Sequence, residues 1–294
     1  MKIKDAIEFG IQMLSEGFGN ETDLGDNREI TSNVYFLLSY LTKMSISELK
    51  SEQNKELSKD EINIFNSWLA RRLEMEPVQY ITGETEFWSL PFYVGPGVLI
   101  PRQDTETLIN EVKDHFKDKN GDYRFLDIAC GSGCIGISLS KIFPNSNVTF
   151  VDKYDVPIMY TERNIKRHGL KDRTDIIKSD MFSNIPKNSK FDAIVSNPPY
   201  IPQDELRSIS MQITLFEPME SLTAGSSGLD FYELFASQAV NFLTPNGALF
   251  LEIGYNQCED VTRILKEKGW NDVKAVKDLG GNHRVVIAKN PNVR

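Results

Sequence analysis

From about residue 104 to the end of the chain, segments with the period of a strand alternate with segments that have the period of a helix. The strand-like segments are short and rich in β-branched residues, and the longer segments between them carry apolar residues three and four positions apart. Alternation of this kind predicts an α/β fold, with a mostly parallel sheet covered by helices on both faces. The last two strands have no helix between them, which favours an antiparallel hairpin at one edge of the sheet.

The expected elements of this region follow directly from the periodicity. They are helix 105–117, strand 124–128, helix 134–142, strand 148–152, helix 156–168, strands near 175–178 and 191–196, helix 228–243, strand 247–253, helix 257–268, and strands near 272–277 and 284–289. Residues 201–224 contain few periodic apolar positions, so they are expected to form a long loop. Such a loop is either a lid over a site or an ordinary surface connection.

The N-terminal part of the chain shows helical periodicity only. The apolar residues from Ile30 to Leu41 recur at the spacing of a buried helical stripe, and Ser45 and Ser58 each begin a capping box with a glutamate three residues later. We therefore expect three parts: a small helical bundle at 1–76, a linker with a short β-hairpin at 77–103, and the α/β domain at 104–294. The bundle either packs against the rest of the chain or docks a protein partner.

Charge and composition exclude several classes of protein. Lys and Arg number 33 against 42 Asp and Glu, which gives a net charge of −9 and argues against nucleic acid as the main partner. Three cysteines and three histidines, scattered along the chain, do not predict a disulfide framework or a metal site. No apolar segment reaches the roughly 18 residues of a membrane span. We expect a monomeric cytoplasmic protein that binds neither nucleic acid nor membranes.

A glycine-rich turn follows the first strand of the α/β domain. Ala129, Cys130, Gly131, Ser132 and Gly133 lead directly into a helix, where small residues allow a ligand to approach the backbone. Asp152 ends the next strand, and its carboxylate can accept hydrogen bonds from both hydroxyls of a ribose. The pattern also fits the dinucleotide fingerprint of an oxidoreductase. Asp127, four residues before Gly131, favours a cationic ligand such as S-adenosyl-L-methionine, which carries a sulfonium and an ammonium group.

The most specific segment is Asn197-Pro198-Pro199-Tyr200, which follows the strand at 191–196. The two prolines have no N–H donors, so the Asn197 side-chain oxygen and the Pro198 carbonyl can form a rigid pair of acceptors for a planar NH2 group. Two such hydrogen bonds can orient the nitrogen lone pair toward a methyl carbon bound to sulfur, and Tyr200 can stack on the planar group. An adenine amino group in DNA, flipped out of the duplex, would fit the same device. The remaining alternatives are a dinucleotide-dependent oxidoreductase and a binding module without catalytic activity.

Several motifs together resemble one family. They are Pro77 to Gly83, Glu86 to Pro91, Leu99 to Glu106, Ser196 to Pro202, Phe216 to Pro218, and Leu251 to Gly254. In these segments the chain is similar to the class I S-adenosylmethionine-dependent methyltransferases, and more closely to the HemK/PrmC family of protein-glutamine methyltransferases. The resemblance implies a Rossmann-like fold and methylation of the side-chain amide nitrogen, N5, of the glutamine in the Gly-Gly-Gln motif of peptide chain release factors. S-adenosyl-L-homocysteine would be the second product, and the N-terminal helical domain would help to hold the release factor.

The resemblance also implies a set of site residues. Asn197, Pro198, Pro199 and Tyr200 would be catalytic and would bind the substrate glutamine. The cofactor would contact Asn197 and Asp127, Ala129, Cys130, Gly131, Ser132, Gly133, Asp152, Asp180 and Met181, with Met181 beside the adenine. The family commonly has Gly-Thr-Gly at 129–131 and an aromatic residue at 181, so these departures are expected to affect cofactor affinity.

Residues near the motifs receive more ordinary interpretations. Arg102, Asp104, Thr105 and Glu106 could line the floor of the site. The interpretation that we favour is that Asp104 and Thr105 are N-cap candidates for the helix that follows them, with Glu106 in its first turn. Cys130 and Cys134 are interpreted as small apolar fillers, and His283 and Arg284 as surface residues.

Overall fold

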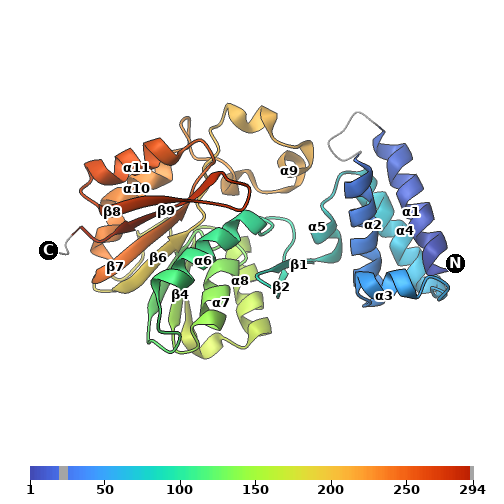
Figure 1. Cartoon of the computed structure of the whole chain (residues 1–294), viewed down its shortest axis with the longest axis horizontal. Helices are drawn as coiled ribbons and strands as arrows, with labels where there is room; N and C mark the ends of the chain where they lie inside the picture. Colours follow the sequence, from blue (N-terminus) through green and yellow to red (C-terminus); the bar gives the residue numbers. More distant parts are fainter. Residues whose placement is uncertain (20–25, 292–294) are drawn as a thin grey trace. The chain divides into compact units, whose positions relative to one another are not determined.

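The computed structural model describes residues 1–19 and 26–291. The chain divides into two compact units, Met1–Glu84 with Ser210–Phe216 and Thr85–Ile209 with Glu217–Arg294. The first unit is helical, and the second contains a large sheet (Figure 1). This division assigns no role to either unit, so the expected organisation into 1–76, 77–103 and 104–294 stays a prediction.

The helical unit is built around a single apolar core. Its helices are α1 (Ile3–Phe18), α2 (Asn27–Thr42), α3 (Ile46–Ser51), α4 (Lys59–Leu73), α5 (Val78–Thr82) and, from a distant part of the sequence, α9 (Met211–Phe216). In α2, Ile30, Val34, Leu37 and Leu38 are fully buried and pack with apolar residues of α1 and α4. The helical stripe predicted from the sequence is therefore confirmed in this helix.

Both predicted capping boxes are present, at the first residues of α3 and α4. The Ser45 backbone N–H donates to Glu48 Oε2 at 2.7 Å, and the Glu48 N–H donates to Ser45 Oγ at 3.2 Å. Ser58 and Glu61 make the same two bonds at the start of α4. The bonds from the serine backbones lower the pKa of both glutamates. Each glutamate is therefore ionised near a helix N-terminus, where a negative charge is stabilising.

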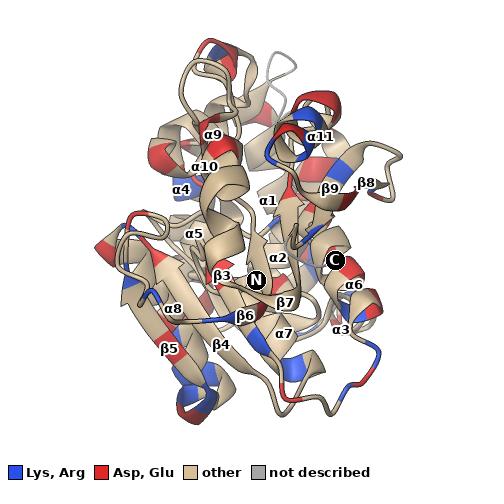
Figure 2. Ribbon diagram, turned by 90° about the vertical axis from the view of Figure 1, so that its left-hand side faces the viewer, with Lys and Arg blue, Asp and Glu red and all other residues tan. Residues whose placement is uncertain are grey.

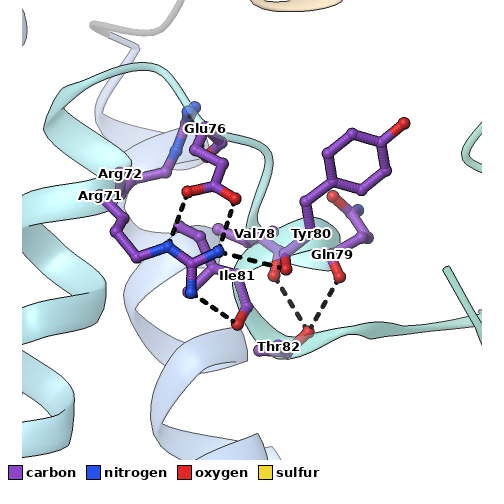
Figure 3. Close-up of polar contacts among 8 residues, drawn as sticks. All are labelled: Arg71, Arg72, Glu76, Val78, Gln79, Tyr80, Ile81 and Thr82. Carbon is purple, nitrogen blue, oxygen red and sulfur yellow. Dashed lines mark hydrogen bonds and ion pairs between the residues drawn. The ribbon is translucent and has the colours of Figure 1, made fainter. Parts of the chain in front are cut away.

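An arginine at the end of α4 connects this helix to α5 (Figure 3). Arg71 donates to both carboxylate oxygens of Glu76, at 2.7 and 2.5 Å, and to the Ile81 carbonyl at 3.2 Å. The last carbonyls of a helix have no partner within the helix, so Arg71 supplies one of the missing donors. The Thr82 hydroxyl donates to the Val78 carbonyl at 3.0 Å. The bond from Arg71 therefore holds the short helix α5 against the end of α4, and the bond from Thr82 closes α5 internally.

The second unit contains a seven-stranded sheet. Its strands are β3 (Arg124–Ile128), β4 (Asn147–Asp152), β5 (Thr174–Lys178), β6 (Phe191–Ser196), β7 (Leu243–Glu252), β8 (Asn271–Lys277) and β9 (His283–Lys289), in the spatial order β5-β4-β3-β6-β7-β9-β8. The strands from β5 to β7 pair in parallel, and β9 is antiparallel to both β7 and β8. The mostly parallel sheet and its antiparallel edge hairpin are therefore confirmed. A separate short hairpin consists of β1 (Glu84–Phe87) and β2 (Leu90–Tyr93).

Helices cover both faces of this sheet (Figure 1). On one face lie α6 (Glu106–His115), α7 (Cys134–Ile142) and α8 (Asp155–His168), and on the other lie α10 (Asp230–Gln238) and α11 (Cys258–Glu267). Successive residues of a strand point to opposite faces. In β3, Phe125 accordingly packs into the apolar core under α6, α7 and α8, and Leu126 packs into the core under α10 and α11. Both residues are fully buried.

The order of the strands indicates where a ligand can bind at the edge of the sheet. The chain runs from β3 outward to β5, then returns to β6 on the other side of β3. In open parallel sheets, ligands bind beyond the carboxyl ends of the strands at such a reversal. The glycine-rich turn follows β3 and the Asn-Pro-Pro-Tyr turn follows β6, so the two most specific segments of the sequence lie at the same reversal.

Two segments differ from the sequence-based expectations. The helix expected at 228–243 ends at Gln238, a short 3₁₀ helix occupies Ala239–Asn241, and β7 already begins at Leu243. The Phe191 N–H donates to the Phe242 carbonyl at 2.8 Å, so pairing with β6 extends the strand despite Pro245 and Gly247. The expected loop at 201–224 contains α9 and two 3₁₀ helices, Glu205–Ser208 and Met219–Ser221. Within residues 1–19 and 26–291, no helix has the length and apolar character needed to span a membrane.

Candidate active site

The glycine-rich turn after β3 has the left-handed conformation that small residues tolerate best. Gly131 and Gly133 have φ of 58° and 78°, and Ala129 has φ of 56°. An alanine in this region is strained because its Cβ approaches the neighbouring carbonyl oxygen. Gly136, one turn into α7, has a different role. A Cβ added there would lie 2.4 Å from the ring of Phe150, so the glycine allows α7 to lie close to β4.

Two side chains of α8, not singled out in the sequence, hold the glycine-rich turn. The Thr161 hydroxyl donates to the Gly131 carbonyl at 2.9 Å, and Asn164 Nδ2 donates to the Ser132 carbonyl at 2.9 Å. Asn164 is fully buried and also exchanges two hydrogen bonds with the backbone of Tyr93. The sequence signal that could have found Thr161 and Asn164 is their position as polar residues on the buried face of this helix.

Asp152 lies at the end of β4 beside the turn. Its Oδ2 accepts a hydrogen bond from the Gly131 N–H at 3.0 Å, and its Oδ1 accepts one from the Tyr154 N–H at 3.1 Å. Burial raises the pKa of this carboxyl, and the hydrogen bonds from the Gly131 and Tyr154 backbones oppose the rise. Because each carboxylate oxygen has two lone pairs, Asp152 can still accept hydrogen bonds from a ligand.

A cavity of about 320 Å³ lies where these segments meet. Nine of the predicted site residues line it: Ala129, Cys130, Gly131, Ser132, Asp152, Asp180, Met181, Asn197 and Pro199. The other four, Asp127, Gly133, Pro198 and Tyr200, are not in its lining. The structure therefore brings the turn after β3 and the turn after β6 to one cavity. This volume lies at the lower end of the range typical of small-molecule sites.

Asp127 is placed behind the glycine-rich turn and is fully buried. Its Oδ2 accepts a hydrogen bond from the Gly136 N–H at 2.9 Å, at the beginning of α7, and its Oδ1 has no hydrogen-bond partner in the part of the chain that the structure describes. Burial raises the pKa of Asp127 to about 7, although the bond from Gly136 opposes this shift. Its contact with the cofactor stays a prediction.

Cys130 and Cys134 are both buried at this turn. Burial raises the pKa of both thiols, for Cys134 to about 12. The thiols are therefore protonated at neutral pH, as expected for apolar fillers. Among residues 1–19 and 26–291, no group of three or more His, Cys, Asp or Glu side chains could hold a metal ion.

The Asn-Pro-Pro-Tyr turn is fixed from both ends. The Ser196 hydroxyl donates to the Ile128 carbonyl at 2.6 Å, which ties the end of β6 to the end of β3. The Tyr200 carbonyl accepts a hydrogen bond from Gln257 Nε2 at 2.8 Å. Gly228 also approaches this carbonyl so closely that an added Cβ would lie 2.4 Å from it. Burial raises the pKa of the Tyr200 hydroxyl to about 12.

Of the two roles considered for Thr105, the structure supports the one of lining the site and not the helix cap. Neither it nor Asp104 makes a side-chain capping bond at the start of α6. Thr105 instead lines the cavity, and its Oγ1 accepts a hydrogen bond from Asn197 Nδ2 at 3.2 Å. The bond uses one N–H of the Asn197 amide and turns Nδ2 toward Thr105, so Oδ1 is left to accept a hydrogen from a ligand.

The interpretation of Arg284 as a surface residue is wrong. Its side chain is only 10% exposed, and its guanidinium forms ion pairs with Asp104 and Asp278, both at 3.1 Å. It also donates to the Ile253 carbonyl at 3.2 Å. The arginine lies on β9, which is inserted between β7 and β8, and this insertion could not be read from the local sequence.

A buried glutamate anchors one wall of the cavity. Glu217 accepts a hydrogen bond from the Ile100 N–H at 3.1 Å and pairs with the guanidinium of Arg102. The next residues of the chain, Pro218, Glu220 and Ser221, line the cavity. The end of the long connection at 201–224 is therefore part of the site. Arg102 also lines the cavity, as the sequence suggested, whereas Glu217 stands in a motif to which the sequence assigned no role.

Known proteins resemble this chain along most of its length. The model of the PrmC N-terminal domain matches residues 24–83, and that of the methyltransferase small domain matches residues 103–225. The release factor glutamine methyltransferase of Clostridium botulinum is 35% identical, with 94% of this chain and 98% of that protein covered. The protein of the same name from Geobacter sulfurreducens is 38% identical, with 79% and 80% covered. A methyltransferase structure from Pyrococcus furiosus, 18% identical with a TM-score of 0.52, covers 76% of this chain and 98% of its own and shares the fold. The chain belongs to the release factor glutamine methyltransferase family.

Proposed function

We propose that this protein transfers a methyl group from S-adenosyl-L-methionine to the side-chain amide nitrogen, N5, of the glutamine in the Gly-Gly-Gln motif of peptide chain release factors. Membership of the family supports the reaction. One observation in the structure carries the argument for the site: Asn197 and Pro199 line the same cavity as the glycine-rich turn and Asp152. The proposed acceptor for an NH2 group and the proposed nucleoside site therefore line the same cavity.

The lining of the cavity fits S-adenosyl-L-methionine. Asp152, at the end of β4, would present its carboxylate to the ribose hydroxyls, and the turn from Ala129 to Gly133 would allow close approach of the amino acid part. Met181 offers alkyl and sulfur contact to the adenine in place of an aromatic ring. When bound, this cofactor supplies an electrophilic methyl carbon on a sulfonium.

The chain's own residues orient the nucleophile. An amide nitrogen is a poor nucleophile because its lone pair is delocalised into the carbonyl group. Asn197 Oδ1 and the Pro198 carbonyl would accept the two hydrogens of the glutamine NH2 and so orient its lone pair toward the methyl donor. Pro198 is not in the cavity lining, but it lies between Asn197 and Pro199, which both are. Proximity and preorganised dipoles then account for the rate enhancement. The methylated nitrogen loses one proton to water after transfer, so no side chain is needed as a base.

The helical unit is proposed to recognise the release factor outside its tripeptide. Phe9, Ile46 and Ile64 of this unit are large apolar residues that remain exposed. Replacing all three with Ser is expected to raise the KM for the release factor while the Kd for the cofactor is unchanged. An unchanged KM would contradict this role.

Acidic and basic positions are interspersed along the ribbon in Figure 2, and the net charge of the whole chain is −9. A site for duplex DNA needs clustered positive charge to neutralise phosphates. These observations support a protein substrate over DNA adenine. We therefore propose that the protein does not act on nucleic acid. We also propose that it is a cytoplasmic monomer.

The test of the proposed function offers two acceptors to the same enzyme. The protein is incubated with isotope-labelled S-adenosyl-L-methionine and either a release factor or duplex DNA, and the modified atom is identified by mass spectrometry. We expect a single methyl group on the glutamine of the tripeptide and none on DNA. A release factor with that glutamine replaced by Glu is the control, because it has no amide nitrogen. Labelling of DNA alone would reject the proposal.

A further inference from the structure

The amide of Asn197 is held by a hydroxyl that is itself held by a buried carboxyl. Thr105 is only 2% exposed, and its Oγ1 accepts a hydrogen bond from Asn197 Nδ2 at 3.2 Å. The same hydroxyl faces the carboxyl of Glu252, and hydrogen bonding from Thr105 lowers the pKa of that carboxyl. Glu252 is the last residue of β7 and is 1% exposed. Residues from three separate segments therefore form a chain of hydrogen bonds that leads from the inside of the sheet to the cavity.

This chain of hydrogen bonds has a direction because a hydroxyl carries a single hydrogen. An ionised carboxylate can only accept, so Thr105 donates its hydrogen to Glu252 and has only lone pairs left for Asn197. Nδ2 of Asn197 must then face Thr105, and Oδ1 becomes the atom available to a ligand. An amide turned the other way would present N–H donors to the N–H donors of a substrate amide, which is unfavourable.

We infer that Thr105 and Glu252 are positioning residues that determine which way round the amide of Asn197 meets the substrate. The inference rests on the proposed function, since it requires that Asn197 Oδ1 accept a hydrogen from a glutamine side chain. Glu252 acts through Thr105, because the carboxyl of Glu252 does not line the cavity.

Several groups surround the carboxyl of Glu252. They are Thr105, Asp104 and Arg102 from the segment before α6, Cys134 from α7, Tyr200 after β6, Tyr232 from α10, and Arg284 from β9. On the side of α10, the Tyr232 hydroxyl donates to the backbone carbonyl of Glu252 at 3.0 Å. Oε2 of Glu252 has no hydrogen-bond partner among residues 1–19 and 26–291.

The protonation of Glu252 decides whether this direction is maintained. Burial raises the pKa of Glu252 to about 7, while the hydrogen bond from Thr105 and the charge of Arg284 oppose the rise. Below that pH the carboxyl carries a hydrogen that it can donate to Thr105. The Thr105 hydrogen is then free to bond Asn197 Oδ1, and the orientation of the amide is no longer determined. The carboxylate is therefore the form that supports catalysis.

The first experiment changes the hydroxyl and keeps the shape of the side chain. Thr105→Val removes both hydrogen bonds, and we expect kcat on the release factor to fall by about 10–100-fold, the range seen when a residue orienting a ligating group is lost. The Kd for S-adenosyl-L-methionine should remain within about twofold of wild type, which also reports an intact site. Thr105→Ser retains the hydroxyl and should recover most of kcat. Thr174→Val is the matched control, because the Thr174 hydroxyl bonds only the Leu170 carbonyl at the start of β5.

The second experiment removes the titration. Glu252→Gln has nearly the same shape and cannot ionise. With both substrates saturating, wild-type kcat should rise between about pH 6 and pH 8, and the variant should have a lower kcat that changes little over this range. Parallel pH profiles for the two proteins would overturn the role of Glu252.

The outcomes separate the two proposals. If the wild-type enzyme methylates no glutamine, the proposed function fails. If it does so and Thr105→Val retains the wild-type kcat, only the positioning inference fails. A loss of kcat in Thr105→Val that Thr105→Ser does not recover would also overturn the inference, because side-chain packing would then explain the effect.

Discussion

The contact between α7 and β4 predicts that Gly136→Ala destabilises the protein. The added Cβ would lie 2.4 Å from Cε1 and 2.7 Å from Cζ of Phe150, and 2.9 Å from Cγ1 of Val148. Phe150 is fully buried and Val148 is 1% exposed, so neither can move without displacing the sheet. Overpacking of this kind costs about 1–3 kcal/mol. The higher helix propensity of alanine returns only about 1 kcal/mol.

The distances place this substitution toward the upper end of the overpacking range, so we expect a net loss of about 1–2 kcal/mol in the free energy of unfolding. The helix should also move away from the sheet. This movement would lengthen the bond from the Gly136 N–H to Asp127, now 2.9 Å, and shift the glycine-rich turn. Cofactor affinity should therefore fall together with stability.

Urea unfolding and calorimetric titration with S-adenosyl-L-methionine measure the two effects. Ser140→Ala is the control on the same helix. Ser140 is fully buried, and its hydroxyl has no hydrogen-bond partner in the described part of the chain. Its removal is expected to be neutral or slightly stabilising. If Gly136→Ala were as stable as wild type, close packing of α7 on β4 would not be the reason for glycine at this position.

Four further predictions follow from single residues. Asn197→Ala should lower kcat by about 10²–10³ through loss of one preorganised acceptor, with cofactor binding nearly intact; full activity would reject the mechanism. Ala129→Gly relieves a left-handed alanine that costs about 1–2 kcal/mol and adds about 0.4–1 kcal/mol of chain entropy to the unfolded state. Thermal unfolding should therefore show a small gain in stability, and a loss would mean that the turn is unstrained. The pKa of Asp127 is raised to about 7 in the folded protein, so the carboxyl stays protonated there while it ionises in the unfolded chain. The free energy of unfolding should therefore decrease as the pH rises from about 4 to 7. Chemical unfolding across this range should show a weaker decline in Asp127→Asn, and an equal decline would contradict the assigned burial. Arg71→Met removes the ion pair with Glu76. Because the Arg71 side chain is 40% exposed, the free energy of unfolding should fall by only about 0.5–1.5 kcal/mol, measured by thermal unfolding. An unchanged stability would mean that the pair contributes nothing.

Much of the fold could be predicted from the sequence because its signals are local. The alternation of strand and helix periods after residue 104 predicted the parallel sheet, and the serine and glutamate pairs at 45–48 and 58–61 predicted two helix starts. Strand boundaries were less predictable, since β7 begins at Leu243 only because its backbone pairs with β6. The two turns at the site were also visible, because glycine and proline constrain the backbone of their own residues wherever they occur.

What the sequence by itself determined was the chemistry available at the ends of β3 and β6: a turn open to a ligand, and a corner without donors. Only the tertiary structure decided which side chains support that corner. Thr105, Glu252 and Arg284 lie far from Asn197 along the chain and come together through the strand order, in which β9 is inserted beside β7. Hydrogen bonds and burial act over a few ångströms in space, and local sequence patterns do not report distances between segments that fold together.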